Sequence, residues 1–316
     1  MAKCQLCRSV DIGKAPYQNW GWPHSKLFDE IEIFVCSACG FGSAHPEPNL
    51  HDLDEFYQTQ YRSPGSPFFI DFENRSDRWE PNPRALAQLA LVSMFTDLDD
   101  MDPILELGPG RGDIFNCLAQ MERTPGLHCV EPAGLAASFY EKAFEAQTHD
   151  DLGAVELIGE RFKLIVMSHV LEHFSGSEIV PLLSRLHGVS DNGGFLMIEV
   201  PHEDYRNIDV PVWNTPHLSF FGSDALREAL LISGWELVFI GRCGPPVEAS
   251  VLDPWHEKKS EVRPPKGSRR VIKKILGRSV WAALSSLKRS QRRADLNSQL
   301  YGDQGSNLRA LAVKRM

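Results

Sequence analysis

The sequence predicts an α/β protein, in which a small cysteine-rich module precedes a doubly wound domain with a mostly parallel sheet. Two observations predict the large domain. Short apolar runs alternate with helical patterns from residue 99 onward, and a glycine-rich turn directly follows the first of these runs. The third observation is a pair of Cys-x-x-Cys motifs within the first 45 residues. A length of 316 residues has room for one large and one small domain.

The N-terminal module is predicted over residues 1–45. Its four cysteines are Cys4, Cys7, Cys36 and Cys39, and an apolar strand is expected near 31–36. Four thiolates in two such pairs suit a tetrahedral Zn²⁺ ion that is fully ligated and therefore structural. A module of this size buries little core, so the metal would supply folding energy. Four ordinary thiols or a redox pair are the alternatives.

Residues 46–98 are predicted to be a connector and helical cap, rich in proline, aromatic and acidic residues at first and helical over 85–95. The large domain is predicted over 99–316. Its expected strands are 103–107, 127–130, 162–167, 195–200, 235–240 and 308–313, and its expected helices are 114–121, 133–145, 176–187 and 223–231. This order of strands and helices is typical of parallel units joined by right-handed crossovers.

The glycine-rich turn comprises Gly108, Gly110 and Gly112, after a strand that includes Glu106. Glycines allow a tight turn and a close approach of a ligand to the backbone, and the following helix start presents free N–H groups. The dinucleotide fingerprint Gly-x-Gly-x-x-Gly would need its last glycine at position 113, which is Asp113. Because Glu106 and Asp113 would repel a pyrophosphate, the turn is predicted to bind a cationic ligand. A turn without any ligand is the alternative.

An acidic residue, Glu131, ends the next predicted strand, about 20 residues after the turn. In doubly wound nucleotide folds, a carboxylate at this position accepts hydrogen bonds from ribose hydroxyls. The turn and Glu131 together therefore predict a ligand that carries both a ribose and a positive charge.

These residues resemble motif I of the class I S-adenosylmethionine-dependent methyltransferases. The segments 164–173, 193–201 and 216–235 resemble the later landmarks of that family, in the family's order. The resemblance implies a Rossmann-like seven-stranded sheet whose last strand, 308–313, is antiparallel. Residues 244–305 would then be an insertion before that strand.

The resemblance also implies which positions bind S-adenosylmethionine. Glu106 and the three glycines would line the cofactor and Glu131 would bind its ribose. Asp150 would lie near the adenine amine, although the adjacent Asp151 is an alternative. Ser168 and His169 would border the cofactor, and Tyr61 would help to close over it.

Zinc motifs of this kind also occur in bacterial methyltransferases that act on sugars, and Tyr57 and Tyr61 resemble the aromatic residues of that group. The resemblance implies an acceptor that is a sugar, nucleotide sugar, glycan or related small molecule. The methyl acceptor atom would be a hydroxyl oxygen or a carbon. The sugar C-methyltransferases carry a further C-terminal domain that is not expected here, which argues against C-methylation of a ketosugar and leaves O-methylation open.

A hydroxyl acceptor needs a base that takes its proton. His217 is the first candidate, because the corresponding histidine of the resembling group faces the acceptor; His173 and His202 are the alternatives. Each of these could instead be a hydrogen-bonded structural histidine. Glu199, Glu203 and Asp204 are expected to form a solvated acidic rim.

Charge divides the sequence unevenly. Residues 255–316 carry 16 Lys/Arg and 4 Asp/Glu, whereas the preceding residues carry 17 and 38. The segment 269–293 contains 9 basic and no acidic residues, with apolar residues interleaved at roughly helical spacing. Three interpretations stay open: a surface helix, a lid that holds an anionic acceptor, or a peripheral contact with an anionic membrane.

Two other classes of function compete with a small-molecule methyltransferase. A nucleic-acid (RNA) methyltransferase could grip phosphates through the zinc module and the basic segment, but the acidic body argues against it. A non-catalytic cofactor-binding protein is the third hypothesis, against which the intact glycines argue. No run approaches the roughly 18 apolar residues of a membrane span, and no secretory leader is recognisable. The expected location is therefore the cytoplasm, with peripheral attachment to the inner face of the membrane as the alternative.

Overall fold

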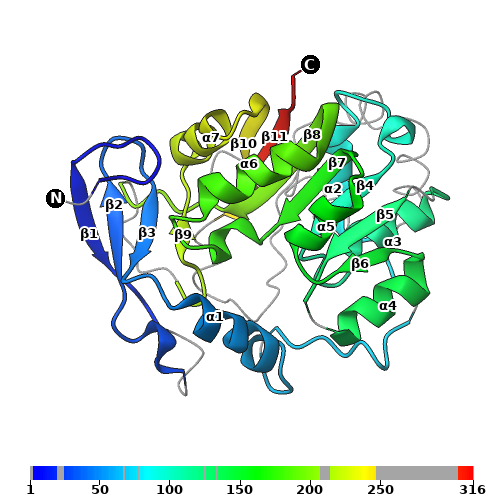
Figure 1. Ribbon diagram of the computed structural model, residues 1–316, viewed down its shortest axis with the longest axis horizontal. Coiled ribbons are helices and arrows are strands. Elements are labelled where there is room, and N and C mark those ends of the chain that lie inside the picture. The colour runs from blue at the N-terminus through cyan, green and yellow to red at the C-terminus, as the bar shows by residue number, and fades with distance from the viewer. Residues whose placement is uncertain are drawn as a thin grey trace.

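The computed structural model describes residues 3–19, 25–66, 68–76, 78–123, 126–132, 134–206, 214–246 and 305–315. Its main feature is a seven-stranded sheet (Figure 1). The strands of this sheet follow one another in the order β10 (Glu236–Pro246), β11 (Gly305–Val313), β8 (Ser190–Pro201), β7 (Phe162–Ser168), β4 (Ile104–Leu107), β5 (Leu127–Val130) and β6 (Gln147–His149).

Strand directions in this sheet agree with the prediction. Strands β6, β5, β4, β7 and β8 pair in parallel, whereas β11 is antiparallel to both β8 and β10. The doubly wound, seven-stranded and mostly parallel sheet with an antiparallel last strand is therefore confirmed. Because parallel strands end at the same edge, the segments after β4, β5, β6 and β7 meet at one side of the sheet, where ligands of such folds bind.

Helices cover both faces of the sheet. Successive residues of a strand point to opposite faces, so each strand contributes apolar side chains to two cores. Ile104 packs in a core with α2 (Pro83–Val92), α3 (Asp113–Gln120) and α4 (Gly134–Phe144). Its neighbour Leu105 packs in a second core with α5 (Leu152–Ile158), α6 (Ile179–Val189) and α7 (Ser223–Ile232). The predicted helices are thus present, with α5 as an addition.

The N-terminal residues form a second, four-stranded sheet in the order β1 (Ile12–Pro16), β2 (Glu32–Cys36), β3 (Gly42–His45) and β9 (Ser219–Phe220). Its first three strands come from the predicted module, and η1 (Lys26–Phe28) lies between β1 and β2. Strand β9 comes from the large domain and pairs with β3. Figure 1 shows this sheet at the left end of the molecule, with β9 on its inner side. The module is therefore joined to the large domain by backbone hydrogen bonds.

The predicted connector contains a helix that the sequence analysis did not anticipate. Helix α1 (Leu50–Phe56) begins at Asn49, whose side chain accepts a hydrogen bond from the His51 amide, and it continues into a π-helical turn, η2 (Tyr57–Tyr61). Phe56 packs with Phe28 of the N-terminal module and Leu218 of the large domain. The connector thus contacts both the N-terminal module and the segment that leads into β9. Two further 3-10 turns are η3 (Leu98–Asp100) and η4 (Leu171–His173).

Most of the predicted insertion 244–305, including the basic segment 269–293, lies outside the described residues. The three interpretations of that segment therefore stay predictions. Among the helices that the structure does describe, none is both long enough and apolar enough to cross a membrane.

Candidate active site and cysteine cluster

The turn after β4 has the backbone conformation that only glycine adopts readily. Gly108, Gly110 and Gly112 have φ values of 59°, 59° and 72°. A Cβ atom at Gly108 would lie 2.8 Å from a methyl carbon of Val170, so this position also lacks the space for a side chain. At Gly110 the nearest atom to such a Cβ would be 3.9 Å away. The turn therefore leaves room beside Gly110, in front of the N-terminus of α3.

Glu106 lies one residue before the end of β4 and is 3% exposed. Its Oε2 atom has no hydrogen-bond partner within the described part of the chain. Burial, together with the charge of Asp113, raises the pKa of Glu106 to about 8. A buried carboxylate without a partner is costly, and a cationic group would relieve that cost. These residues therefore fit S-adenosylmethionine, which carries an ammonium and a sulfonium.

Two further predicted positions lie at the same edge of the sheet. Glu131 directly follows β5, is buried, and forms an ion pair in which Arg62 Nη2 lies 3.3 Å from its Oε2. Asp150 directly follows β6 and is exposed. Asp151 caps α5 by accepting a hydrogen bond of 2.8 Å from the Ala154 amide. Since the Asp151 carboxylate is used in the cap, Asp150 is the better of the two candidates for adenine.

Ser168 and His169 stand at the end of β7, next to β4. Ser168 Oγ accepts a hydrogen bond of 2.8 Å from Gln88 Nε2 of α2. His169 has a positive φ of 56°, which is uncommon for a residue with a side chain. Its ring lies between two carboxylates, with Nδ1 3.3 Å from Glu172 Oε1 and Nε2 3.6 Å from Glu199 Oε1.

The expected solvated acidic rim is wrong. Glu199 is fully buried, and Glu203 and Asp204 are each 6% exposed. Glu199 accepts hydrogen bonds from Arg309 Nε of β11 at 2.7 Å and from Gln88 Nε2 at 3.0 Å, and Arg309 Nη2 forms an ion pair with Glu199 Oε2 at 2.5 Å. Glu199 and Asp204 are each paired with an arginine, which for Asp204 is Arg206 at 2.6 Å, whereas Glu203 lies beside His217.

The sequence alone did not indicate that Glu199 and Arg309 form an ion pair. The available signal was one acidic residue in the apolar run 195–200 and one basic residue in the apolar run 308–313. Arg62 was missed as well, because it stands in the irregular connector and nothing in the sequence pattern relates it to Glu131.

Two of the three candidate bases come together. The rings of His173 and His217 are 5.2 Å apart between centroids and nearly perpendicular. Glu172, which is 1% exposed, and Glu203 border the pair, with Glu203 Oε2 3.6 Å from His217 Nδ1. His202 does not join them: it is held by a hydrogen bond from its amide to Ser306 O and by a bridge to Phe221.

The two histidines have different electrostatic surroundings. Burial lowers the pKa of His173 to about 4, although the charge of Glu172 acts in the opposite direction. Burial alone would also lower the pKa of His217, but the contact with Glu203 and the charge of Glu172 outweigh it and raise this pKa. Burial alone would raise the pKa of Glu172, but His169 and the other two histidines outweigh burial and lower this pKa to about 2.

Aromatic residues of the connector cover the histidine pair. The Tyr57 hydroxyl lies 3.0 Å from His173 Nδ1, and the Tyr61 ring lies 5.1 Å from Tyr57 and 5.8 Å from His173 between centroids. Phe68 stacks on Tyr61 at 4.8 Å. Burial raises the pKa of Tyr61 to about 12, so this phenol stays neutral at physiological pH. Tyr61 therefore lies over the histidine pair.

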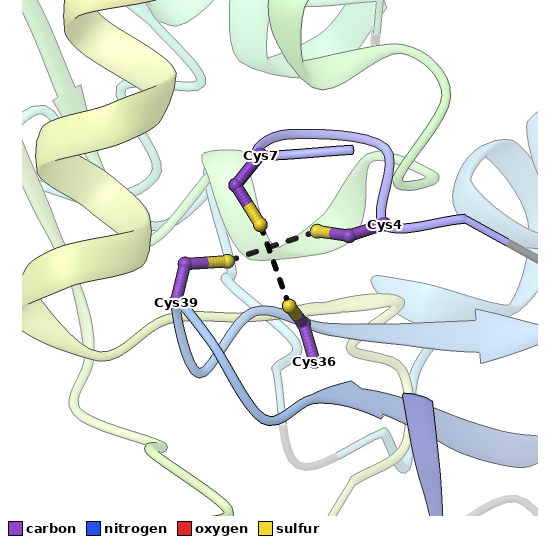
Figure 2. Close-up of side chains that lie close together, drawn as sticks. All are labelled: Cys4, Cys7, Cys36 and Cys39. Atoms are coloured by element: carbon purple, nitrogen blue, oxygen red, sulfur yellow. Dashed lines mark hydrogen bonds between the residues drawn. The ribbon is translucent and has the colours of Figure 1, made fainter. Parts of the chain in front are cut away.

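The four N-terminal cysteines converge (Figure 2). Their sulfur atoms all lie within 4.8 Å of one another, with 3.7 Å between Cys4 and Cys39 and 3.5 Å between Cys7 and Cys36. Zn–S bonds of about 2.3 Å in a tetrahedron separate sulfur atoms by roughly 3.8 Å. The four residues therefore fit a fully ligated zinc ion. Cys4, Cys36 and Cys39 are buried against the core that also contains α6 and α7.

Comparison with known proteins agrees with this geometry. A family model described as a methyltransferase domain matches residues 74–239, just over half of the chain. A search of curated proteins found no match. Among solved structures, the chain is similar to a SAM-dependent methyltransferase from Archaeoglobus fulgidus, with 18% identity and a TM-score of 0.45 over 73% of this chain and 94% of that one.

It is also similar to the geranyl diphosphate C-methyltransferase from Streptomyces coelicolor, solved with S-adenosyl-L-homocysteine, with 13% identity and a TM-score of 0.42 over 73% of this chain and 77% of that one. Likeness at this level concerns the fold alone, whereas the family model matches the residues around the glycine turn, Glu131 and the histidine pair. The chain therefore belongs to the methyltransferase domain family.

Proposed function

We propose that this enzyme transfers a methyl group to a hydroxyl oxygen of a sugar, a nucleotide sugar or a glycan. The observation that carries this proposal is the pair His173 and His217, with Glu172 and Glu203 beside it, at the carboxyl end of β7. Because β7 pairs with β4, the histidines and the glycine turn share one edge of the sheet. An acceptor hydroxyl beside the histidines would therefore face the cofactor.

The chain's own residues would prepare the acceptor in two ways. His217 would take the proton of the hydroxyl, and Glu203 would stabilise the imidazolium that forms, because it lies 3.6 Å from Nδ1. Tyr57 and Tyr61 would contact the apolar face of a sugar ring and exclude water from the site. Bound S-adenosylmethionine supplies an electrophilic methyl carbon, and the acceptor oxygen bonds to this carbon as the carbon–sulfur bond breaks.

We also propose that Cys4, Cys7, Cys36 and Cys39 hold a structural zinc ion. The sulfur distances support it, and four protein ligands leave no open position for catalysis. The ion would fix the two loops that carry the cysteines against the large domain. It would thereby hold β3 in position for its pairing with β9, two residues after His217.

Methyl transfer can be tested directly with zinc-loaded protein and methyl-labelled S-adenosylmethionine, over a panel of nucleotide sugars, glycans and RNA. We expect label on a sugar hydroxyl. We expect His217→Ala to lower turnover by about 100-fold or more while cofactor affinity, measured by calorimetry, is unchanged. His187→Asn is the control, because His187 packs on Trp235, outside the cluster.

Two results would contradict the proposal. Label on RNA with none on any sugar would move the acceptor to another class. Full turnover by His217→Ala, with the same cofactor affinity, would remove His217 from the reaction.

A further inference from the structure

The cluster beneath the connector contains the donor atoms of a metal site as well as the candidate base. Glu172, His173 and His217 each offer one ligand atom, and these atoms all lie within 4.8 Å of one another. The first two residues belong to η4, after β7, and the third stands just before β9. Ligands on one ion are roughly 3–4 Å apart, so side-chain rotations alone would close the set.

Glu172 provides the second, independent observation. Its side chain is 1% exposed, and neither carboxylate oxygen has a hydrogen-bond partner among the described residues. His169 Nδ1 approaches Oε1 at 3.3 Å, as an ion pair without hydrogen-bond geometry. His217 Nδ1 and Glu203 Oε2 likewise have no hydrogen-bond partner within the described part of the chain. Buried polar atoms are nearly always partnered, so several unsatisfied atoms around one point need an explanation.

We propose that Glu172, His173 and His217 bind a divalent transition-metal ion, separate from the zinc of the cysteine cluster. Two imidazoles and one carboxylate are a donor set that suits Mn²⁺, Fe²⁺, Co²⁺ or Zn²⁺, whereas Mg²⁺ and Ca²⁺ prefer oxygen ligands alone. Three protein ligands leave open positions, which oxygen atoms of water or of an acceptor would fill.

The residues around the three ligands fit the supporting shell of a metal site. A histidine ligand usually has its second nitrogen held by a neighbouring group. Tyr57 lies 3.0 Å from His173 Nδ1, and Glu203 lies 3.6 Å from His217 Nδ1. Both contacts would orient an imidazole toward the ion.

Such an ion would change how the acceptor is activated, and this consequence rests on the proposed methyl transfer. The ion would bind the acceptor hydroxyl and lower its pKa. The hydroxyl proton would pass to the Glu203 carboxylate, and the oxygen would bond to the methyl carbon as the carbon–sulfur bond breaks. His217 would then act as a ligand, and its loss would lower turnover through the ion.

Metal binding itself can be measured without acceptor or cofactor. Zinc-loaded, full-length protein is titrated with Mn²⁺, and free Mn²⁺ is followed by electron paramagnetic resonance. Mn²⁺ avoids thiolate sites, so the cysteine cluster does not compete. We expect one Mn²⁺ per chain, binding at least tenfold more weakly to Glu172→Gln and His217→Asn and unchanged in His187→Asn.

Two outcomes would overturn the metal site: no Mn²⁺ binding by the wild-type protein, or equal affinity in Glu172→Gln. If a variant fails to fold, the wild-type protein still decides the matter, because bound Mn²⁺ must broaden the ring proton signals of His173 and His217 before those of His187. Absence of Mn²⁺ binding with normal methyl transfer would refute the ion and leave the proposed function standing.

Discussion

At the scale of single residues, the cofactor side of the site depends on conformation and on one buried charge. Gly108, Gly110 and Gly112 hold left-handed backbone positions, and Glu106 lies behind them without a hydrogen-bond partner for Oε2 in the described part of the chain. The glycine turn and an acidic residue just before it were expected from residue types and spacing alone. The burial that sets the pKa of Glu106 was not, since it depends on the helices that cover β4.

Gly110→Val should abolish measurable cofactor binding in calorimetry. A branched side chain would be strained at a φ of 59° and would fill the room beside the turn. Gly159→Val is the matched control, because Gly159 has a φ of 72°, open space around it and a position at the end of α5. An unchanged affinity in Gly110→Val would refute the assignment of the turn.

Cofactor affinity should increase as the pH rises from about 6 to 8. In the free protein, a pKa of about 8 keeps Glu106 largely protonated below that pH, and a cationic cofactor favours the carboxylate. Binding therefore expels a proton, which strengthens affinity by up to about tenfold per pH unit until the pH passes 8. Calorimetry in buffers of different ionisation enthalpy measures this release. Glu106→Gln should lose it; a proton release that persists there would assign it to another group.

At the scale of elements, the sequence-based prediction agrees best with the structure for elements that are long enough to show a clear periodicity. Strand β5 has the predicted bounds, and α3 and α7 agree within one residue at each end. Helices α1 and α5 have seven residues each, so they show too few turns for a helical pattern to be read. Strand β9 has two residues, and its pairing with β3 is a tertiary event.

Loss of one partner of the ion pair between Glu199 of β8 and Arg309 of β11 should destabilise the protein more than loss of both partners. Arg309→Met leaves Glu199 buried with its charge poorly compensated and should lower the free energy of unfolding by about 3–5 kcal/mol. The double variant with Glu199→Leu should recover most of that loss. Arg315→Met is the control: its ion pair with Glu236 is exposed and contributes about 1 kcal/mol or less. Urea denaturation measures all three, and equal losses in Arg309→Met and Arg315→Met would contradict the buried pair.

At the scale of the whole molecule, the two sheets depend on each other. The cysteine-bearing loops pack on the core of α6 and α7, β9 completes the N-terminal sheet, and α1 packs against both the module and Leu218 of the large domain. The predicted boundary at residue 45 marks the end of β3, but the sheet to which β3 belongs continues at residue 219.

Removal of zinc should therefore loosen more than the module. With a chelator, hydrogen exchange should increase over residues 1–45 and also around β9, and the thermal midpoint should fall, because metal-dependent folding energy is lost. Cys36→Ser should lower the zinc content below one ion per chain. Cys243→Ser is the control, since Cys243 is buried far along the chain in β10. Unchanged exchange at β9 would show that the module responds alone.

The sequence by itself determined the order of the longer strands and helices of the large domain, the glycine turn, the cysteine set and the carboxylate after β5, because these depend on local periodicity and on fixed spacings. Only the tertiary structure decided which polar residues meet. It brought His173 and His217 together while His202 stayed apart, and it buried the supposed acidic rim, including Glu199 beside Arg309. It also showed how the N-terminal module is joined to the large domain. The physical reason is that burial and charge pairing depend on segments far apart in sequence that only packing brings into contact.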